Sequence, residues 1–191
     1  MHAGSPSLLL LPALALLALF AQARVPSVDI DTADLSGFEA LTLQGAASGD
    51  FLGHSVSAAG DVNGDGFADV IVGAYLADPN GRSMAGVAYV ILGTDTGFAT
   101  VDLASFVSGD STGFIIWGAA TRYFLGYSVS GAGDVNSDGF ADVIVGAPFA
   151  DLDGRSGAGV AYLLFGMASG FTTLDLLGFV SGDSTGFIIW A

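Results

Sequence analysis

Asp61-Val-Asn-Gly-Asp-Gly-Phe-Ala-Asp69 recurs 73 residues later as Asp134-Val-Asn-Ser-Asp-Gly-Phe-Ala-Asp142. Each copy has an oxygen-bearing side chain at its first, third, fifth and ninth positions and a glycine at its sixth. Alternating positions let a tight loop aim its carboxylates at one point, and glycine allows the positive φ that wraps the chain around a hard cation. The pattern therefore predicts a loop that binds a divalent cation, and calcium in particular.

The predicted calcium ligands are the side chains at the four oxygen positions and one backbone carbonyl in each loop. Two like charges about 4 Å apart repel by about 4 kcal/mol at an effective dielectric near 20, so converging carboxylates need a doubly charged ion between them. The ligands are Asp61, Asn63, Asp65, Asp69 and the carbonyl of Phe67 in the first loop, and Asp134, Asn136, Asp138, Asp142 and the carbonyl of Phe140 in the second.

Two other kinds of loop share parts of this pattern. An Asp- and Gly-rich surface turn that binds nothing has a similar composition, but both copies keep every ligand position while Gly64 is replaced by Ser137. An EF-hand needs a glutamate at position twelve and flanking helices. Position twelve is Val72 or Val145, inside a strand-like Val-Ile-Val run, so the EF-hand interpretation fails.

The loops lie inside a longer repeat. Residues 51–117 and 124–190 are identical at 49 of 67 aligned positions, and partial copies begin near residue 41 and at residue 181. Each period contains four short β-like runs, at 54–58, 69–73, 87–92 and 113–117, separated by Gly-, Asp- and Asn-rich turns. This pattern predicts an all-β partial propeller of four-stranded antiparallel blades, about two full blades plus partial ones. Residues 101–106 are compatible with a single helical turn.

Both periods resemble FG-GAP repeats, the units of the seven-bladed propeller in integrin α subunits and in many bacterial surface proteins. The matching residues are Leu52-Gly-His-Ser-Val56, Leu125-Gly-Tyr-Ser-Val129, the two Asp-rich loops, Gly146-Ala-Pro148, and Gly-Val-Ala-Tyr at 86–89 and 159–162. Leucine stands where the family often has phenylalanine, and the first copy reads Gly73-Ala-Tyr75 where the family has Gly-Ala-Pro. The resemblance implies a calcium ion in a hairpin loop on one face of the propeller.

Composition limits the partners of this chain. Four arginines and no lysine oppose 19 acidic residues, which gives a net charge of −15 and excludes the basic surface that nucleic-acid binding needs. An apolar run at 8–20 followed by Ala21-Gln-Ala23 predicts a signal peptide over residues 1–23, with an uncleaved N-terminal anchor as the alternative. Either way, we expect an extracellular or cell-surface location.

No catalytic residues are predicted. His54 is replaced by Tyr127 in the next repeat, which indicates an aromatic packing position, and Trp117 and Trp190 occupy equivalent ends of an apolar strand. Gly126-Tyr-Ser-Val-Ser lacks the second glycine of a nucleophile elbow. A carboxylate pair acting as in glycosidases is the remaining catalytic alternative, but almost all carboxylates belong to the loops or to turns.

The sequence thus predicts three regions: the signal peptide at 1–23, a linker at 24–34, and propeller repeats over 35–191 with full periods at about 51–123 and 124–191. We expect a non-enzymatic module whose structural calcium supports adhesion or protein–protein recognition. The alternative is the propeller portion of an extracellular hydrolase, similar to the FG-GAP blades of glycosylphosphatidylinositol-specific phospholipase D. Two blades do not close a ring of four to eight, so we expect part of a larger propeller or, alternatively, several chains associating through open blade faces. A self-assembling surface array is a third interpretation.

Overall fold

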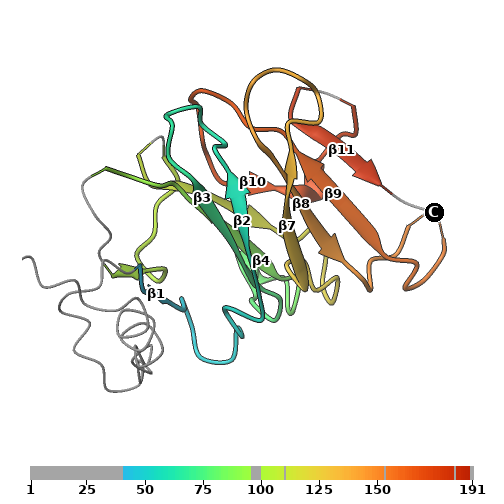
Figure 1. Cartoon of the computed structure of the whole chain (residues 1–191). Helices are drawn as coiled ribbons and strands as arrows, with labels where there is room; N and C mark the ends of the chain where they lie inside the picture. The colour runs from blue at the N-terminus through green and yellow to red at the C-terminus, as the bar shows by residue number, and fades with distance from the viewer. Residues whose placement is uncertain (1–40, 96–99, 110, 153, 183, 190–191) are drawn as a thin grey trace, which may run out of the picture. The chain divides into compact units, whose positions relative to one another are not determined.

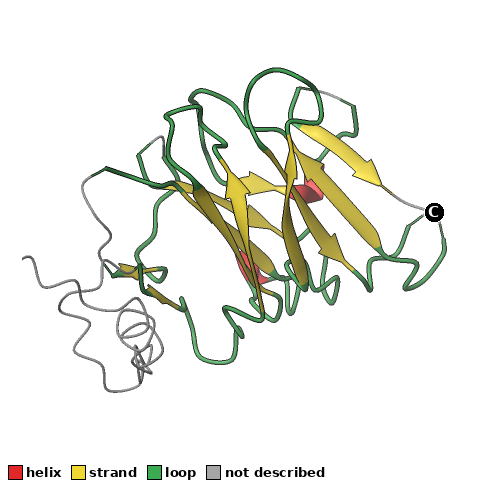
Figure 2. Cartoon of the chain, viewed as in Figure 1, coloured by secondary structure: helices red, strands yellow, loops and turns green. Residues whose placement is uncertain are grey.

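The computed structural model describes residues 41–95, 100–109, 111–152, 154–182 and 184–189, and they are almost entirely strand and loop (Figures 1 and 2). The predicted signal peptide, the linker and Trp190 lie outside these residues. The strands are β1 (Leu43–Gln44), β2 (Ser55–Gly60), β3 (Asp69–Ala74), β4 (Val87–Ile91), β5 (Val101–Asp102), β6 (Gly113–Trp117), β7 (Ser128–Gly133), β8 (Asp142–Ala147), β9 (Val160–Leu164), β10 (Leu174–Asp175) and β11 (Gly186–Ile189). Two short 3-10 turns, η1 (Pro79–Gly81) and η2 (Leu176–Gly178), complete the described elements.

Two blades are built from these strands, as the repeat predicts. Blade 1 has the antiparallel order β2-β3-β4-β6, and blade 2 has the equivalent order β7-β8-β9-β11. The four β-like runs of the sequence correspond to these strands, so the all-β prediction is confirmed. β2 packs against β7, and in the described residues the two sheets form part of a propeller without closing into a ring.

Each blade also donates a short strand to the sheet before it. β10 pairs in parallel with β6, which makes the blade 1 sheet five-stranded, and β5 pairs in parallel with β1 in the same way. In the segment 101–106, Val101 and Asp102 are extended to pair with β1, and a turn follows in which the N–H groups of Ser105 and Phe106 donate to the carbonyls of Asp102 and Leu103, at 3.2 and 3.4 Å. In the second repeat the equivalent turn is η2, which directly follows β10.

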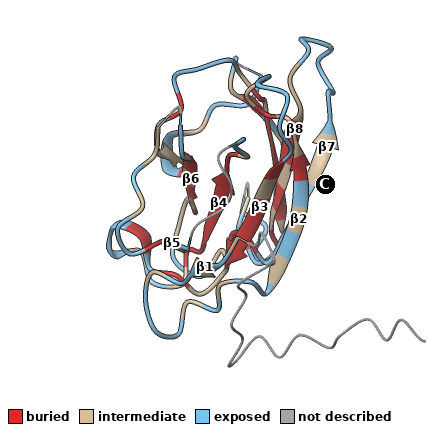
Figure 3. Cartoon of the chain, turned by 60° about the vertical axis from the view of Figure 1, so that its left-hand side comes forward, coloured by how far each residue is buried: buried red, intermediate tan, exposed pale blue. Residues whose placement is uncertain are grey.

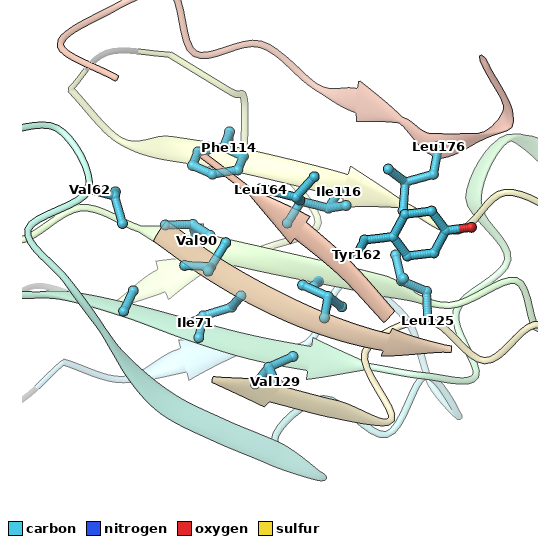
Figure 4. Close-up of a cluster of buried hydrophobic side chains, with 14 of the residues drawn as sticks. Val62, Ile71, Val90, Phe114, Ile116, Leu125, Val129, Tyr162, Leu164 and Leu176 are labelled. Carbon is cyan, nitrogen blue, oxygen red and sulfur yellow. The ribbon is translucent and has the colours of Figure 1, made fainter. Parts of the chain in front are cut away.

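Strand alternation sorts the apolar side chains of blade 1 onto two faces. Ile71, Val90 and Ile116 are 0% exposed and lie in the larger core cluster between the two blades (Figure 4). The opposite face, with Tyr89 and Ile91, packs in a second cluster against residues near β1 and β5. Figure 3 shows β3 and β4 buried and much of β2 exposed. The interior strands of each blade are therefore apolar on both faces, as expected for sheets stacked on both sides.

Candidate calcium loops

The two Asp-rich loops occupy the same place in each blade. Residues 61–68 connect β2 to β3, and residues 134–141 connect β7 to β8. The sixth position has φ of +91° at Gly66 and +95° at Gly139, a conformation that side chains disfavour. The sequence-based reason for glycine at this position is therefore borne out by the backbone.

The first aspartate of each loop is turned inward onto the loop backbone. Asp61 Oδ1 accepts hydrogen bonds from the N–H groups of Gly64 at 2.7 Å and Asp65 at 3.0 Å, and its Oδ2 accepts from Gly66 at 2.9 Å. In the second loop, Asp134 accepts from the N–H groups at positions 138 and 139, at 3.1 and 3.0 Å. Both loops are thus folded around the carboxylate of their first residue.

The third and fifth positions contact each other directly. Asn63 Nδ2 donates to Asp65 Oδ2 at 2.7 Å, and the Asp65 N–H donates back to Asn63 Oδ1 at 3.1 Å. Asn136 and Asp138 form the same pair of bonds, at 2.7 and 3.1 Å. The structure therefore brings the third and fifth side chains of each predicted ligand set into contact and places the first side chain on the backbone of the same loop.

The ninth position lies behind the loop and is fully buried. Asp69 is 0% exposed, and its two carboxylate oxygens accept from the N–H groups of Val62 and Gly93, each at 2.7 Å. Burial raises the pKa of Asp69; the two N–H bonds oppose this effect, and the charges of Asp65 and Asp61 reinforce it. This carboxylate thus joins the start of its loop to the end of β4.

Asp142 repeats this arrangement in blade 2. It is 0% exposed and accepts from the N–H groups of Val135 at 2.7 Å and Gly166 at 3.0 Å. The sequence interpretation grouped the ninth residue with the cation ligands. In the structure its carboxylate already accepts hydrogen bonds from two separate backbone segments. Its role as a ligand stays a prediction.

Gly93 and Gly166 are functional positions that the sequence interpretation missed. A Cβ atom at Gly93 would lie 2.5 Å from the Ala68 carbonyl oxygen and 2.8 Å from Phe67 Cβ, so only glycine lets the end of β4 approach the loop. The signal was available, because a glycine lies 24 residues after the ninth-position aspartate in both repeats. The sequence analysis uses this region only for the β-like run at 87–92, which ends just before Gly93.

The donor set of each loop fits a hard cation. Every predicted ligand is a carboxylate, amide or carbonyl oxygen, the ligand type that calcium prefers. Asp61 Oδ1 already accepts two N–H bonds, whereas the other carboxylate oxygens described above accept one and have further acceptor capacity. Among the described residues, no group of three or more His, Asp or Glu side chains is arranged as a metal centre. The loops therefore have suitable chemistry, and binding would require their side chains to turn toward the ion.

The first loop also forms part of the contact between the blades. The Ala141 N–H donates to the Asp61 carbonyl, and the Met167 N–H donates to the Val62 carbonyl, both at 2.9 Å. The Phe140 ring lies against Gly64, because a Cβ at Gly64 would come 2.6 Å from that ring. A change in the shape of the first loop would therefore alter its hydrogen bonds and its ring contact with blade 2.

The aromatic positions pack as predicted. His54 lies 4.7 Å from Tyr75 and 5.0 Å from Tyr127, measured between ring centroids. Trp117 packs against the second core cluster with Val101 and Phe106. These contacts give both residues a packing role.

The family model "FG-GAP repeat" matches residues 52–91 and 125–164. These two segments are FG-GAP repeats. Integrin alpha-PS2 of Drosophila melanogaster is 33% identical over 132 residues, which is 67% of this chain and 9% of that protein. Integrin alpha pat-2 of Caenorhabditis briggsae is 38% identical over 95 residues, 50% of this chain and 7% of the relative.

A hydrolase is also among the relatives. Phosphatidylinositol-glycan-specific phospholipase D of Bos taurus is 34% identical over 119 residues, 62% of this chain and 14% of the enzyme. The chain thus spans a small part of each of these relatives. Within the part of the chain that the structure describes, no helix is long and apolar enough to cross a membrane.

Proposed function

We propose that residues 35–191 form a calcium-binding FG-GAP propeller module, preceded by a signal peptide at 1–23 and a linker at 24–34. The module is extracellular or displayed at the cell surface, where it supports adhesion or recognition of another protein. The integrin relatives support this assignment, and so does the absence of a catalytic constellation from the sequence. The observation that carries the proposal is the set of hydrogen bonds that the two loops share, at Asp61, Asn63 and Asp65 and at their counterparts Asp134, Asn136 and Asp138.

Calcium has a structural role in this proposal. The ion would be held by the side chains of the first, third and fifth positions and by the Phe67 or Phe140 carbonyl, with the ninth-position carboxylate completing the charge. When bound, it neutralises the acidic side chains and makes each hairpin rigid. Because the first loop contacts blade 2 through the Asp61 and Val62 carbonyls, calcium would also strengthen the contact between the blades.

Differential scanning calorimetry tests the proposal. Extracellular calcium modules bind with Kd of about 10⁻⁴–10⁻³ M, so calcium at 10 mM is at about 10–100 times Kd and stabilises the folded state by about 1.4–2.7 kcal/mol per site. For a chain of this size that corresponds to a Tm increase of about 3–10 °C per loop over the protein in EDTA. Unchanged Tm values in EDTA and in 10 mM calcium would contradict the proposal.

The paired variant Asp65→Asn, Asp138→Asn provides the matched comparison. It removes one negative charge from each loop at an exposed position and keeps the shape of the side chain. We expect it to fold with an unchanged Tm in EDTA and to lose most of the calcium-dependent increase. An equal response in the variant and the wild type would show that calcium acts elsewhere.

A second function is favoured by the phospholipase relative. In this alternative the repeats are the non-catalytic propeller of a larger extracellular hydrolase. The coding sequence on either side of these 191 residues distinguishes the two functions. A zinc-dependent catalytic domain beside the repeats would favour the hydrolase, whereas further repeats or an anchor would favour adhesion.

A further inference from the structure

The two Asp-rich loops contact each other through backbone groups of residues in their predicted ligand sets. The Ala141 N–H of the second loop donates to the Asp61 carbonyl of the first at 2.9 Å. This N–H belongs to the same peptide group as the Phe140 carbonyl, which is the predicted backbone ligand of the second loop. The side chain of Asp61 is the first predicted ligand of the first loop. One peptide group therefore joins a ligand of the second loop to a residue that supplies a ligand of the first.

A second connection runs between the two ninth-position carboxylates. Asp69 accepts from the Val62 N–H at 2.7 Å, and the Val62 carbonyl accepts from the Met167 N–H at 2.9 Å. The residue before Met167 is Gly166, whose N–H donates to Asp142 at 3.0 Å. The two buried carboxylates are thus linked by a short run of backbone hydrogen bonds that crosses from one loop to the other.

A ring of the second loop lies where a side chain of the first loop would otherwise be. Gly64 has a φ of +74°, and a Cβ atom there would come within 2.6 Å of the Phe140 ring. The second loop has Ser137 at this position, with a φ of +62°, so the loop conformation itself accepts a side chain. Glycine at position 64 is therefore explained by the neighbouring loop and not by the ligands of its own loop.

We infer that the two loops bind calcium cooperatively, so that each filled loop raises the affinity of the other. The inference rests on the proposed calcium binding of both loops. Binding requires the ligand side chains to turn toward the ion, and this ordering costs conformational entropy. A filled loop holds its side of the shared contacts in place, so the other loop has less entropy to lose when it binds. In addition, a peptide group whose carbonyl coordinates a cation is polarised, which strengthens the hydrogen bond that its N–H donates to Asp61.

The size of the coupling can be bounded. Each loop must change the affinity of the other by the same factor, because the coupling free energy belongs to the pair. Coupled sites typically affect each other's affinity by about 5- to 150-fold. Two sites of equal intrinsic affinity half-fill at a concentration that is lower by the square root of this factor. Loss of the coupling should therefore raise the half-saturating calcium concentration by at least about twofold.

Site-resolved NMR titration with calcium measures this change. The N–H groups of Gly66 and Gly139 each donate to the first aspartate of their own loop, so their signals report the two loops separately. Asp138→Asn weakens the second loop, and Asp65→Asn weakens the first. In each variant we expect the remaining loop to half-saturate at a calcium concentration at least about twofold higher than in the wild type. The titrations are run at about 0.15 M salt, where a Debye length of about 8 Å limits the direct effect of the removed charge.

Gly64→Ser separates the contact from the ligands. It gives the first loop the same nine residues as the second, so every predicted ligand stays and only the position next to the Phe140 ring changes. We expect Gly139, in the unchanged second loop, to half-saturate at a calcium concentration at least about twofold higher. Ser137→Gly is the matched control, because it makes the reciprocal exchange and keeps the contact of Gly64 with Phe140; Gly66 should then titrate as in the wild type. Phe140→Ala removes the ring and keeps the carbonyl, and it should raise the half-saturating concentration at Gly66 even if Gly64→Ser does not fold.

The results separate this inference from the proposed function. If neither glycine signal responds to calcium, both the proposed function and the inference are overturned. If calcium binds with the wild-type half-saturation in the two aspartate variants and in Gly64→Ser, the proposed function stands and the coupling alone is overturned. Tighter binding by one loop when the other is weakened would also overturn the coupling, because repulsion between the sites would then exceed the effect of the contacts.

Discussion

Arg82 and Asp175, 93 residues apart in the chain, form a bidentate ion pair at 2.8 and 3.1 Å that joins the two blades. Asp175 also accepts from the Leu177 N–H at 3.0 Å, so one carboxylate both caps η2 and holds the neighbouring blade. The blade contact therefore depends on this ion pair as well as on the apolar core.

Asp175→Asn should destabilise the protein by about 1–2 kcal/mol, because it replaces charged hydrogen bonds with weaker neutral ones. Asp102→Asn is the matched control. Asp102 caps the Ala104 N–H at 3.0 Å as Asp175 caps Leu177, so it reports the cost of the cap without the Arg82 contact. Urea unfolding of both variants at a concentration where the protein is monomeric measures the difference. Equal losses would mean that the ion pair contributes nothing.

The same ion pair predicts a pH dependence. Burial alone would raise the pKa of Asp175, but the hydrogen bonds from Arg82 and Leu177 and the charge of Arg82 outweigh it and lower the pKa below the ordinary value. An acid whose pKa is lower in the folded state stabilises that state above its unfolded pKa of about 3.9, and the contribution is lost as the pH falls through the folded value. The stability difference between wild type and Asp175→Asn should therefore be constant near pH 7 and shrink below about pH 4. A difference that persists at pH 2 would exclude this explanation.

The second repeat suggests how to fill a cavity in the first. A cavity of about 610 Å³ is lined by Asp50, Asp78, Tyr89 and Trp117, among others. The counterpart of Asp50 is Tyr123, which packs against the core between the blades and donates to the Asp151 carbonyl at 2.9 Å. We expect Asp50→Tyr to stabilise the protein by about 1 kcal/mol through new apolar burial. Thermal unfolding measures the effect, and a destabilised variant would show that the cavity cannot accept the ring.

Asp50→Asn separates charge from volume at the same position. Burial raises the pKa of Asp50, and the charge of Asp78 reinforces this against a hydrogen bond from the Ala47 N–H. An acid with a raised folded pKa costs stability as the pH rises from its unfolded pKa to its folded one. The advantage of Asp50→Asn over wild type should therefore be absent at low pH and develop above about pH 4. An advantage that is already present at pH 2 would point to a cause other than charge.

The sequence predicted the blades well because each strand is a compact apolar run bounded by Gly- and Asp-rich turns, and because the repeat shows each run twice. It did not predict β5 and β10, because two residues such as Val101 and Asp102 have no periodicity, and their extended conformation depends on a distant partner strand. The sequence also did not predict that Asp69 accepts backbone hydrogen bonds from Val62 and Gly93, for a related reason. Its partner Gly93 lies on another strand, and the motif alone does not distinguish a carboxylate that faces an ion from one that faces the backbone.

The division of roles within the loop predicts opposite effects for two similar substitutions. Asp69→Asn replaces one oxygen of a fully buried carboxylate with an NH₂ group, which cannot accept from either Val62 or Gly93. A buried donor would lose its partner, so we expect a loss of about 2–4 kcal/mol in EDTA and in calcium alike. Asp65→Asn, at an exposed position, should leave the stability in EDTA within about 0.5 kcal/mol and weaken calcium binding only. Chemical denaturation of both variants, each with and without calcium, separates the two roles. If Asp69→Asn is as stable as the wild type in EDTA, the hydrogen bonds from Val62 and Gly93 to the buried carboxylate do not stabilise the fold, and its principal role is as a ligand.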